Sequence, residues 1–274
     1  MDSRGANPVD PYHAIAGLYD LEHDPFQEDI DLILNFAGVA EGPILEMGCG
    51  SGRILAPLAE AGYTVVGFDT STTMLDRART RLAKAAPTGR AHLVEGDMAD
   101  ATQVPGGPFG LVMFTLNSLM HLPSPELQLA ALANARRSLA AGGQILIDTV
   151  NPTPDYLVSL ASAPALEWSA ELDDGSMLDK WVFRTVHAVD QIIDTTVWYD
   201  QVGVAGELRR YRSQFELRFV HPNELSLMLS AAGFSDVRMY GGYELDPLDD
   251  SSDRILVTAE ASPGEAGHHS QSHP

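Results

Sequence analysis

The sequence predicts an α/β protein with a seven-stranded, mostly parallel sheet that carries helices on both faces. Short apolar segments alternate with helical patterns through the first 150 residues, as in successive strand–helix–strand units. The apolar segments are continuous, which is typical of parallel strands that are buried on both faces. Acids stand at or near the ends of several segments, and right-handed crossovers bring such ends to one edge of a doubly wound sheet. We therefore expect a ligand to bind at that edge.

Each element is predicted from a local pattern. Residues 12–38 show two helical patterns, in which apolar residues recur at helical spacing. The strands expected next are 43–47, 64–69, 91–97, 110–115 and 144–150. The helices expected between them are 53–61, 71–86 and 125–139. Ser71 is the expected N-cap of helix 71–86, and Gly142 with Gly143 is expected to close helix 125–139.

The pattern changes after Asn151. Residues 166–220 contain long β segments separated by turns at 173–175, 189–191 and 203–206, which predicts an antiparallel insertion after the fifth strand. A helix at 221–234 and strands at 234–241 and 254–260 then complete the sheet. We expect a flexible arm over 1–11, one domain over 12–261 and a disordered tail over 262–274.

Composition narrows the class of partner. The chain has 274 residues, with 17 Lys and Arg against 38 Asp and Glu, and a formal net charge of -21. A chain this acidic repels phosphate backbones and anionic lipid, so we expect no nucleic-acid or membrane partner. The single cysteine, Cys49, allows no disulfide within the chain, and residues 1–13 lack the basic and apolar regions of a signal peptide. We expect a cytoplasmic protein and leave open whether it forms a homodimer.

The segment ILEMGCGSGR, residues 44–53, places three glycines at every second position between an expected strand and an expected helix. Glycine permits a tight turn and lets a ligand approach the bare backbone, while the helix N-terminus offers N–H groups with partial positive charge. A dinucleotide fingerprint requires G-x-G-x-x-G, but Arg53 stands at its third glycine position. A Walker loop requires Gly-Lys-Ser/Thr, which is absent from this segment.

Three motifs together point to a family. LEMGCGSGR at 45–53, VVGFD at 65–69 and EGDM at 95–98 resemble the successive motifs of class I S-adenosylmethionine-dependent methyltransferases. The resemblance covers 43–150, and the last helix and two strands match that Rossmann-like fold, whose seventh strand is antiparallel. The insertion resembles that of small-molecule methyltransferases related to glycine N-methyltransferase and sugar N-methyltransferases. The resemblance implies methyl transfer from S-adenosylmethionine to an N or O atom of a small-molecule acceptor, with S-adenosylhomocysteine as product.

The resemblance also implies roles on the cofactor side. Asp69 would accept hydrogen bonds from both ribose hydroxyls. Glu46 and the backbone at Gly48 and Gly50 would face the methionine part of the cofactor. Arg53 would pair with the methionine carboxylate.

Asp97 and Met98 resemble the family's adenine-binding pair. The other residues that the resemblance places at the cofactor are Tyr19, Cys49, Thr70, Met74 and Leu116. Three alternatives stay open from the residues alone: Asp69 as the N-cap of the next helix, Asp97 as a turn residue and Arg53 as a solvated helix residue.

Two residues are candidates for catalysis next to the methyl acceptor. His121 resembles the active-site His of sugar N-methyltransferases and is the candidate base. Tyr19 resembles the N-terminal Tyr that covers the donor, and Tyr12 is a lesser candidate. Packing roles for His121 and Tyr19 remain alternatives. The segment TLNSLMHLP at 115–123 lacks the Asn/Asp-Pro-Pro-aromatic motif of DNA and protein-amide methyltransferases, which disfavours those substrates.

Other classes of site are less well supported. Asp148 and Asn151 lie where metal-assisted methyltransferases carry ligands, but the fourth strand offers no Asp, so we expect no metal. A nicotinamide-dependent oxidoreductase is one alternative function, against which Arg53 and the Asp97 motif argue. A non-catalytic module that binds S-adenosylmethionine is the other, because its donor motifs would look the same.

Overall fold

The computed structural model describes residues 10–85, 89–100, 104–160 and 163–262. Residues 1–9 of the expected arm and 263–274 of the expected tail lie outside these ranges. Among the helices described, none has the length and apolar character that a membrane crossing requires.

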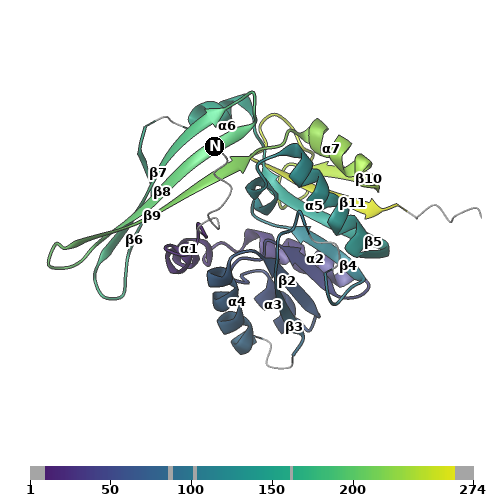
Figure 1. Cartoon of the computed structure of the whole chain (residues 1–274), viewed down its shortest axis with the longest axis horizontal. Helices are drawn as coiled ribbons and strands as arrows, with labels where there is room; N and C mark the ends of the chain where they lie inside the picture. The colour runs from purple at the N-terminus through teal and green to yellow at the C-terminus, as the bar shows by residue number, and fades with distance from the viewer. Residues whose placement is uncertain (1–9, 86–88, 101–103, 161–162, 263–274) are drawn as a thin grey trace, which may run out of the picture.

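The larger sheet has seven strands. They are β1 (Ile44–Met47), β2 (Val65–Asp69), β3 (Ala91–Glu95), β4 (Phe109–Phe114), β5 (Leu139–Val150), β10 (Phe234–Tyr240) and β11 (Arg254–Ala261). Their order in the sheet is β10-β11-β5-β4-β1-β2-β3 (Figure 1). The pairs among β1 to β5 are parallel, whereas β11 runs antiparallel to both β5 and β10. This confirms the predicted mostly parallel sheet with its last strand reversed.

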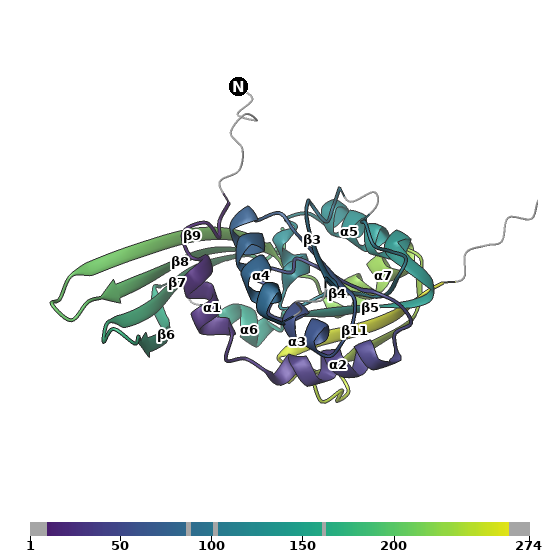
Figure 2. The ribbon, with the colours of Figure 1, turned by 90° about the horizontal axis from the view of Figure 1, so that it is seen from below.

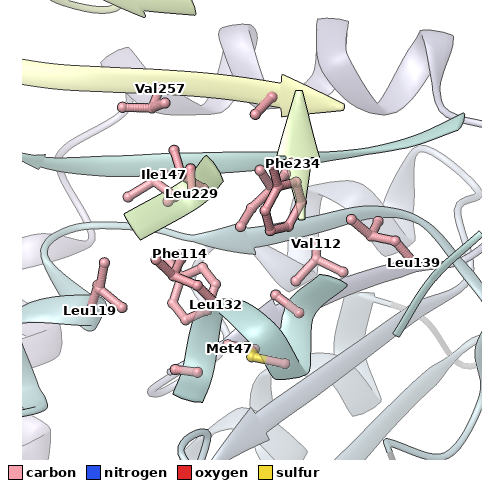
Figure 3. Packing of buried hydrophobic residues seen from close by; sticks show 14 of the residues in the cluster. Met47, Val112, Phe114, Leu119, Leu132, Leu139, Ile147, Leu229, Phe234 and Val257 are labelled. Atoms are coloured by element: carbon pink, nitrogen blue, oxygen red, sulfur yellow. The ribbon is translucent and has the colours of Figure 1, made fainter. Parts of the chain in front are cut away.

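Helices cover both faces of this sheet. They are α2 (Glu28–Val39), α3 (Leu55–Glu60) and α4 (Thr72–Ala85) on one face and α5 (Pro125–Ser138) and α7 (Pro222–Ala231) on the other. β4 shows why both faces must be covered, because its six residues are all buried. Val112 and Phe114 pack toward α5 and α7 (Figure 3), while Leu111 and Met113 pack toward α2 and α3. Full burial of each such side chain contributes about 1.5–3 kcal/mol.

The chain between β5 and α7 forms a short helix and a second sheet. These elements are α6 (Pro154–Ser159), β6 (Ala165–Glu171), β7 (Met177–His187), β8 (Ile192–Val202) and β9 (Leu208–Arg218). The four strands pair antiparallel in chain order, with turns where the sequence predicts them. Helix α1 (Ala16–His23) lies beside this sheet (Figures 1 and 2). Glu22 of α1 accepts hydrogen bonds from Lys180 Nζ at 2.6 Å and from the Tyr199 hydroxyl at 2.8 Å.

The prediction that Gly142 and Gly143 close helix α5 is wrong. The helix ends at Ser138, and β5 begins at once with Leu139, so both glycines lie inside the strand. The pairing of β4 with β5 shifts register here, and a Cβ at Gly143 would lie 2.9 Å from the Phe109 carbonyl oxygen. Close approach of the neighbouring backbone therefore requires glycine at position 143.

Candidate functional site

A cavity of about 230 Å³ opens at the C-terminal ends of β1, β2 and β4. Apart from Asp97, every site residue that the sequence predicts lines this cavity, and they come from separate strands, loops and helices. These residues are Tyr19, Glu46, Gly48, Cys49, Gly50, Arg53, Asp69, Thr70, Met74, Met98, Leu116 and His121. The cavity is thus at the sheet edge where the strand pattern predicts a ligand site.

The glycine loop forms the floor of the cavity. Gly48 and Gly50 have φ angles of 78° and 52°, which favour glycine over any other residue. A Cβ at Gly48 would lie 2.7 Å from Ser118 Cβ, so the loop and the segment after β4 meet only because this side chain is absent. The Gly50 N–H donates to Asp69 Oδ2 at 2.8 Å, which joins the loop to the end of β2.

Asp69 is held by backbone groups. Its Oδ1 accepts from the Ser71 N–H at 2.8 Å, while its Oδ2 accepts from Gly50. Each carboxylate oxygen has more than one lone pair, so the group can accept further hydrogen bonds from the cavity. The N-cap of α4 is Ser71, whose Oγ accepts from the Met74 N–H at 3.1 Å. Burial raises the pKa of Asp69, which the two N–H groups oppose.

Glu46 carries an unsatisfied oxygen into the cavity. The residue is 2% exposed, and its Oε1 accepts from Thr115 Oγ1 at 2.6 Å. Its Oε2 is buried and has no hydrogen-bond partner in the described part of the chain. Burial raises the pKa of Glu46 to about 8. An ammonium group at Oε2 would satisfy this oxygen and favour the ionised carboxylate, so the site fits a cationic amino group.

Arg53 is buried, not solvated. It is 9% exposed, and its Nη1 donates to Asp29 Oδ1 and to the Phe26 carbonyl, both at 2.9 Å. Its Nη2 pairs with Asp29 Oδ2. A guanidinium has five N–H donors, so groups remain for a carboxylate in the cavity. Asp29 is a site residue that the sequence did not indicate, because only the packing of α2 brings it to Arg53.

Asp97 lies outside the cavity lining, although its neighbours Gly96 and Met98 belong to it. Its side chain is exposed, and Oδ1 accepts from the Ala99 N–H at 2.8 Å. Asp97 thus stabilises its own turn, and contact of this carboxylate with adenine stays a prediction. The Met98 carbonyl is fixed by the buried Asn134, whose Nδ2 donates to it at 2.7 Å.

His121 lies at the other side of the cavity, in a 3₁₀ helix over Ser118–His121. Its Nε2 is 3.2 Å from the Tyr12 hydroxyl. Burial lowers the pKa of His121 to about 4 and raises the pKa of Tyr12 well above its usual value, so both groups are neutral near pH 7. The Tyr12 O–H donates to Nε2 in the tautomer protonated at Nδ1, whereas Nε2–H donates to the Tyr12 oxygen in the other tautomer. The sequence ranks Tyr12 only as a lesser candidate.

Aromatic rings surround this pair. Tyr19 meets Tyr12 edge-on with ring centroids 5.6 Å apart, and it stacks on His23 at 3.8 Å. Phe215 of β9 lies 5.7 Å from the His121 ring centroid, so the insertion packs against the Tyr12–His121 pair, although Phe215 itself does not line the cavity. Burial raises the pKa of Tyr19, which keeps its hydroxyl protonated.

The segment before α1 joins the connection between β2 and α4 to β9 of the second sheet. The Ser71 hydroxyl donates to Asp10 Oδ2 at 2.7 Å, and the Ser213 hydroxyl of β9 donates to the Pro11 carbonyl at 2.5 Å. Asp10, Pro11 and Tyr12 all line the cavity. This segment therefore covers the site from the side of the insertion.

The two residues weighed as metal ligands have other partners. Asp148 binds Arg254 and Tyr243, and Asn151 Nδ2 donates to the Ser252 carbonyl at 2.9 Å. Within residues 10–262, apart from the gaps noted above, no group of three or more His, Cys, Asp or Glu is placed to hold a metal ion.

Comparison with known proteins identifies a domain within the chain. Residues 44–143, which contain the glycine loop and the ends of β2 and β3, match the family described as a methyltransferase domain. Over these residues the chain carries a methyltransferase domain. A solved structure of the glycopeptide N-methyltransferase MtfA, 21% identical to this chain, contains S-adenosylmethionine. The unsatisfied Glu46 Oε2 in the cavity of this methyltransferase domain fits a cationic amino group.

The methyltransferase domain is similar to curated and solved proteins. A ubiquinone biosynthesis O-methyltransferase from Aromatoleum aromaticum is 32% identical over 122 residues, which cover 44% of this chain and 50% of the relative. The chain spans between half and two thirds of the length of the first curated relatives it matches.

Two solved structures share the fold over nearly the whole chain. The CcbJ methyltransferase from Streptomyces caelestis has a TM-score of 0.76 at 24% identity, covering 94% of this chain and 100% of the other. The sugar N-methyltransferase KedS8 from Streptoalloteichus has a TM-score of 0.72 at 18% identity, covering 96% and 100%. Because both sequence identities are below 25%, the similarity is evidence for a shared fold alone.

Proposed function

We propose that this chain transfers a methyl group from S-adenosylmethionine to the nitrogen of a small-molecule amine. The observation that carries the proposal is the neutral Tyr12–His121 pair at the end of the cavity that also holds the unsatisfied Glu46 oxygen. The donor supplies a methyl group that is already activated on a sulfonium. The chain then needs mainly to hold the acceptor in line and to exclude water.

On the donor side, each residue has a distinct task. Glu46 Oε2 accepts from the donor's ammonium, and the free N–H groups of Arg53 bind its carboxylate. Asp69 accepts from the ribose hydroxyls while Gly50 and Ser71 keep its carboxylate oriented. The missing side chain at Gly48 lets the donor approach the backbone.

On the acceptor side, the state of the Tyr12–His121 pair favours nitrogen over an aliphatic hydroxyl. A His with a pKa of about 4 is too weak a base to ionise an alcohol, and Tyr12 stays protonated. A neutral amine needs no base before it attacks. In the proposed arrangement His121 is protonated at Nδ1 and the Tyr12 O–H donates to its Nε2, so the Tyr12 oxygen is free to accept an N–H of the amine and to orient the nitrogen lone pair.

The insertion caps the acceptor side in this proposal. Phe215 contacts both rings of the pair, with centroids 5.2 Å from Tyr12 and 5.7 Å from His121. The Ser213 hydroxyl holds the Pro11 carbonyl, so β9 also anchors the covering segment. Together they keep water from the space next to His121.

The experiment is a product assay. The purified chain is incubated with S-adenosylmethionine and a panel of amino sugars, other amines and phenols, and S-adenosylhomocysteine release is measured. Turnover with an amine, and a kcat/KM that rises with pH up to the pKa of that amine, supports the proposal. Methylation of a phenol alone would instead support O-methylation, the second candidate, which the names of curated relatives favour.

A further inference from the structure

Asp148, near the C-terminal end of β5, is 3% exposed and accepts hydrogen bonds from three other segments. Its Oδ2 accepts from the Leu116 N–H at 3.1 Å and from the Tyr243 hydroxyl at 3.0 Å. Its Oδ1 accepts from Arg254 Nε at 2.6 Å, and Arg254 Nη2 is also 2.6 Å away. Asp148 thus joins the segment after β4 to the connection between β10 and β11 and to the start of β11.

The segment that Asp148 holds is strained. Leu116 and Asn117 have φ angles of 43° and 66°, so two consecutive residues other than glycine are left-handed. Such conformations are unfavourable for residues other than glycine and persist only where the surroundings fix them. Besides the bond from Leu116, the Asn117 N–H donates to the Asp148 carbonyl at 3.0 Å, and Asn117 Oδ1 accepts from the Val150 N–H at 2.7 Å.

The path of this turn sets the position of site residues. Leu116 lines the donor cavity, and the turn leads directly into the 3₁₀ helix that ends at His121. Ser118 packs against Gly48 of the glycine loop. Asn117 faces the other way and lines a second cavity of about 420 Å³ together with Tyr243 and Arg254.

We propose that Asp148 is a positioning residue for the donor site. It holds the strained turn over Leu116 and Asn117, and thereby keeps Leu116 and His121 in place beside the glycine loop. Arg254 and Tyr243 in turn fix the Asp148 carboxylate. This inference rests on the proposed function in one respect: it assumes that the cavity binds the methyl donor.

The test compares Asp148→Asn with the wild type. Asparagine has nearly the same shape but only one accepting oxygen, so it cannot accept from both Leu116 and Arg254. Calorimetry should show that the dissociation constant for S-adenosylhomocysteine rises about tenfold. Amide hydrogen exchange over residues 115–121 should become faster. A structural role alone would lower the melting temperature without either change.

Glu224→Gln is the matched control. Glu224 is the carboxylate partner of the buried Arg218, with Arg218 Nη2 2.6 Å from its Oε1, and neither residue lines the donor cavity. This variant should lose stability but keep the affinity for S-adenosylhomocysteine and the exchange over 115–121.

Tyr243→Phe keeps the test valid if Asp148→Asn does not fold. It removes a single hydrogen bond to Asp148 and should weaken binding about two- to fivefold. Unchanged affinity and unchanged exchange over 115–121 in the variant that folds would overturn the inference. If the wild type does not bind S-adenosylhomocysteine, the proposed function is contradicted. Amide hydrogen exchange over residues 115–121 would still test whether Asp148 holds the turn.

Discussion

The hydroxyl of Tyr12 lies 3.2 Å from Nε2 of His121, although 109 positions separate the two residues in the chain. The segment before α1 and the 3₁₀ helix after β4 therefore meet at one end of the donor cavity. Both groups are neutral near pH 7, because burial lowers the pKa of His121 to about 4 and raises that of Tyr12.

Tyr12→Phe should lower kcat for an amine acceptor about tenfold, because it removes the oxygen that orients the amine. The affinity for S-adenosylhomocysteine should change less than twofold. Steady-state kinetics and calorimetry measure the two quantities. Tyr63→Phe, which does not line the cavity, is the control and should behave as the wild type. Equal kcat in Tyr12→Phe and the wild type would show that the hydroxyl does not orient the acceptor.

Binding of the product should depend on pH through Glu46. The pKa of this carboxyl is about 8 in the free chain, so it is mostly protonated at pH 6 and must lose a proton to accept the ligand's ammonium. The association constant for S-adenosylhomocysteine should therefore rise between pH 6 and pH 8, by up to about tenfold per unit, and level off above pH 8.

Calorimetry in two buffers of different ionisation enthalpy measures this proton release directly. Near pH 7 the wild type should release close to one proton from Glu46 on binding. In Glu46→Gln that release should disappear, and the affinity should fall. Proton release that is the same in both proteins would assign the pH dependence to another group.

The buried pair of Arg53 and Asp29 should matter for stability. Asp29 is 1% exposed, and removing it leaves a buried guanidinium without its carboxylate. Asp29→Ala should lower the free energy of unfolding by about 3–5 kcal/mol in urea titrations. Asp76→Ala, which breaks the exposed pair with Arg79, should leave it unchanged within error. Similar values for the two variants would mean that Arg53 finds another partner.

Gly48→Ala should abolish tight binding of S-adenosylhomocysteine. Its φ of 78° is strained for alanine, and the new Cβ would lie 2.7 Å from Ser118 Cβ. Gly142→Ala separates backbone strain from the steric clash of the added Cβ. Gly142 has a similar φ of 75°, but no atom lies within 4 Å of an added Cβ. This variant should lose stability and keep its affinity. Wild-type affinity in Gly48→Ala would show that the loop does not need this close approach.

Local patterns were sufficient to predict much of the fold and most of the cavity. Gly48, Gly50 and Asp69 follow strands whose apolar runs are unambiguous, and a parallel sheet brings such ends together. The same local reasoning failed at Gly142 and Gly143, because glycine after a helical pattern is also the signal for a helix end. Helix α6 was not predicted, since six residues are too few to show a period.

Contacts between distant segments could not be predicted. The sequence indicates Arg53 as a ligand for a carboxylate, but its bidentate pairing with Asp29 depends on how α2 packs. The sequence indicates Asp148 only as a residue near the position of metal ligands in related enzymes, and its partners Tyr243 and Arg254 lie about 100 residues later in the chain. Side-chain geometry of this kind is fixed by tertiary packing, which a local pattern does not encode.

The central claim is that the cavity binds S-adenosylmethionine through Asp69 at the end of β2. It is tested most directly by calorimetric titration with S-adenosylhomocysteine and, separately, with NADH, for the wild type and Asp69→Ala. The account predicts that the wild type binds S-adenosylhomocysteine and not NADH, and that Asp69→Ala weakens this binding about tenfold or more. Binding of NADH without binding of S-adenosylhomocysteine would contradict it.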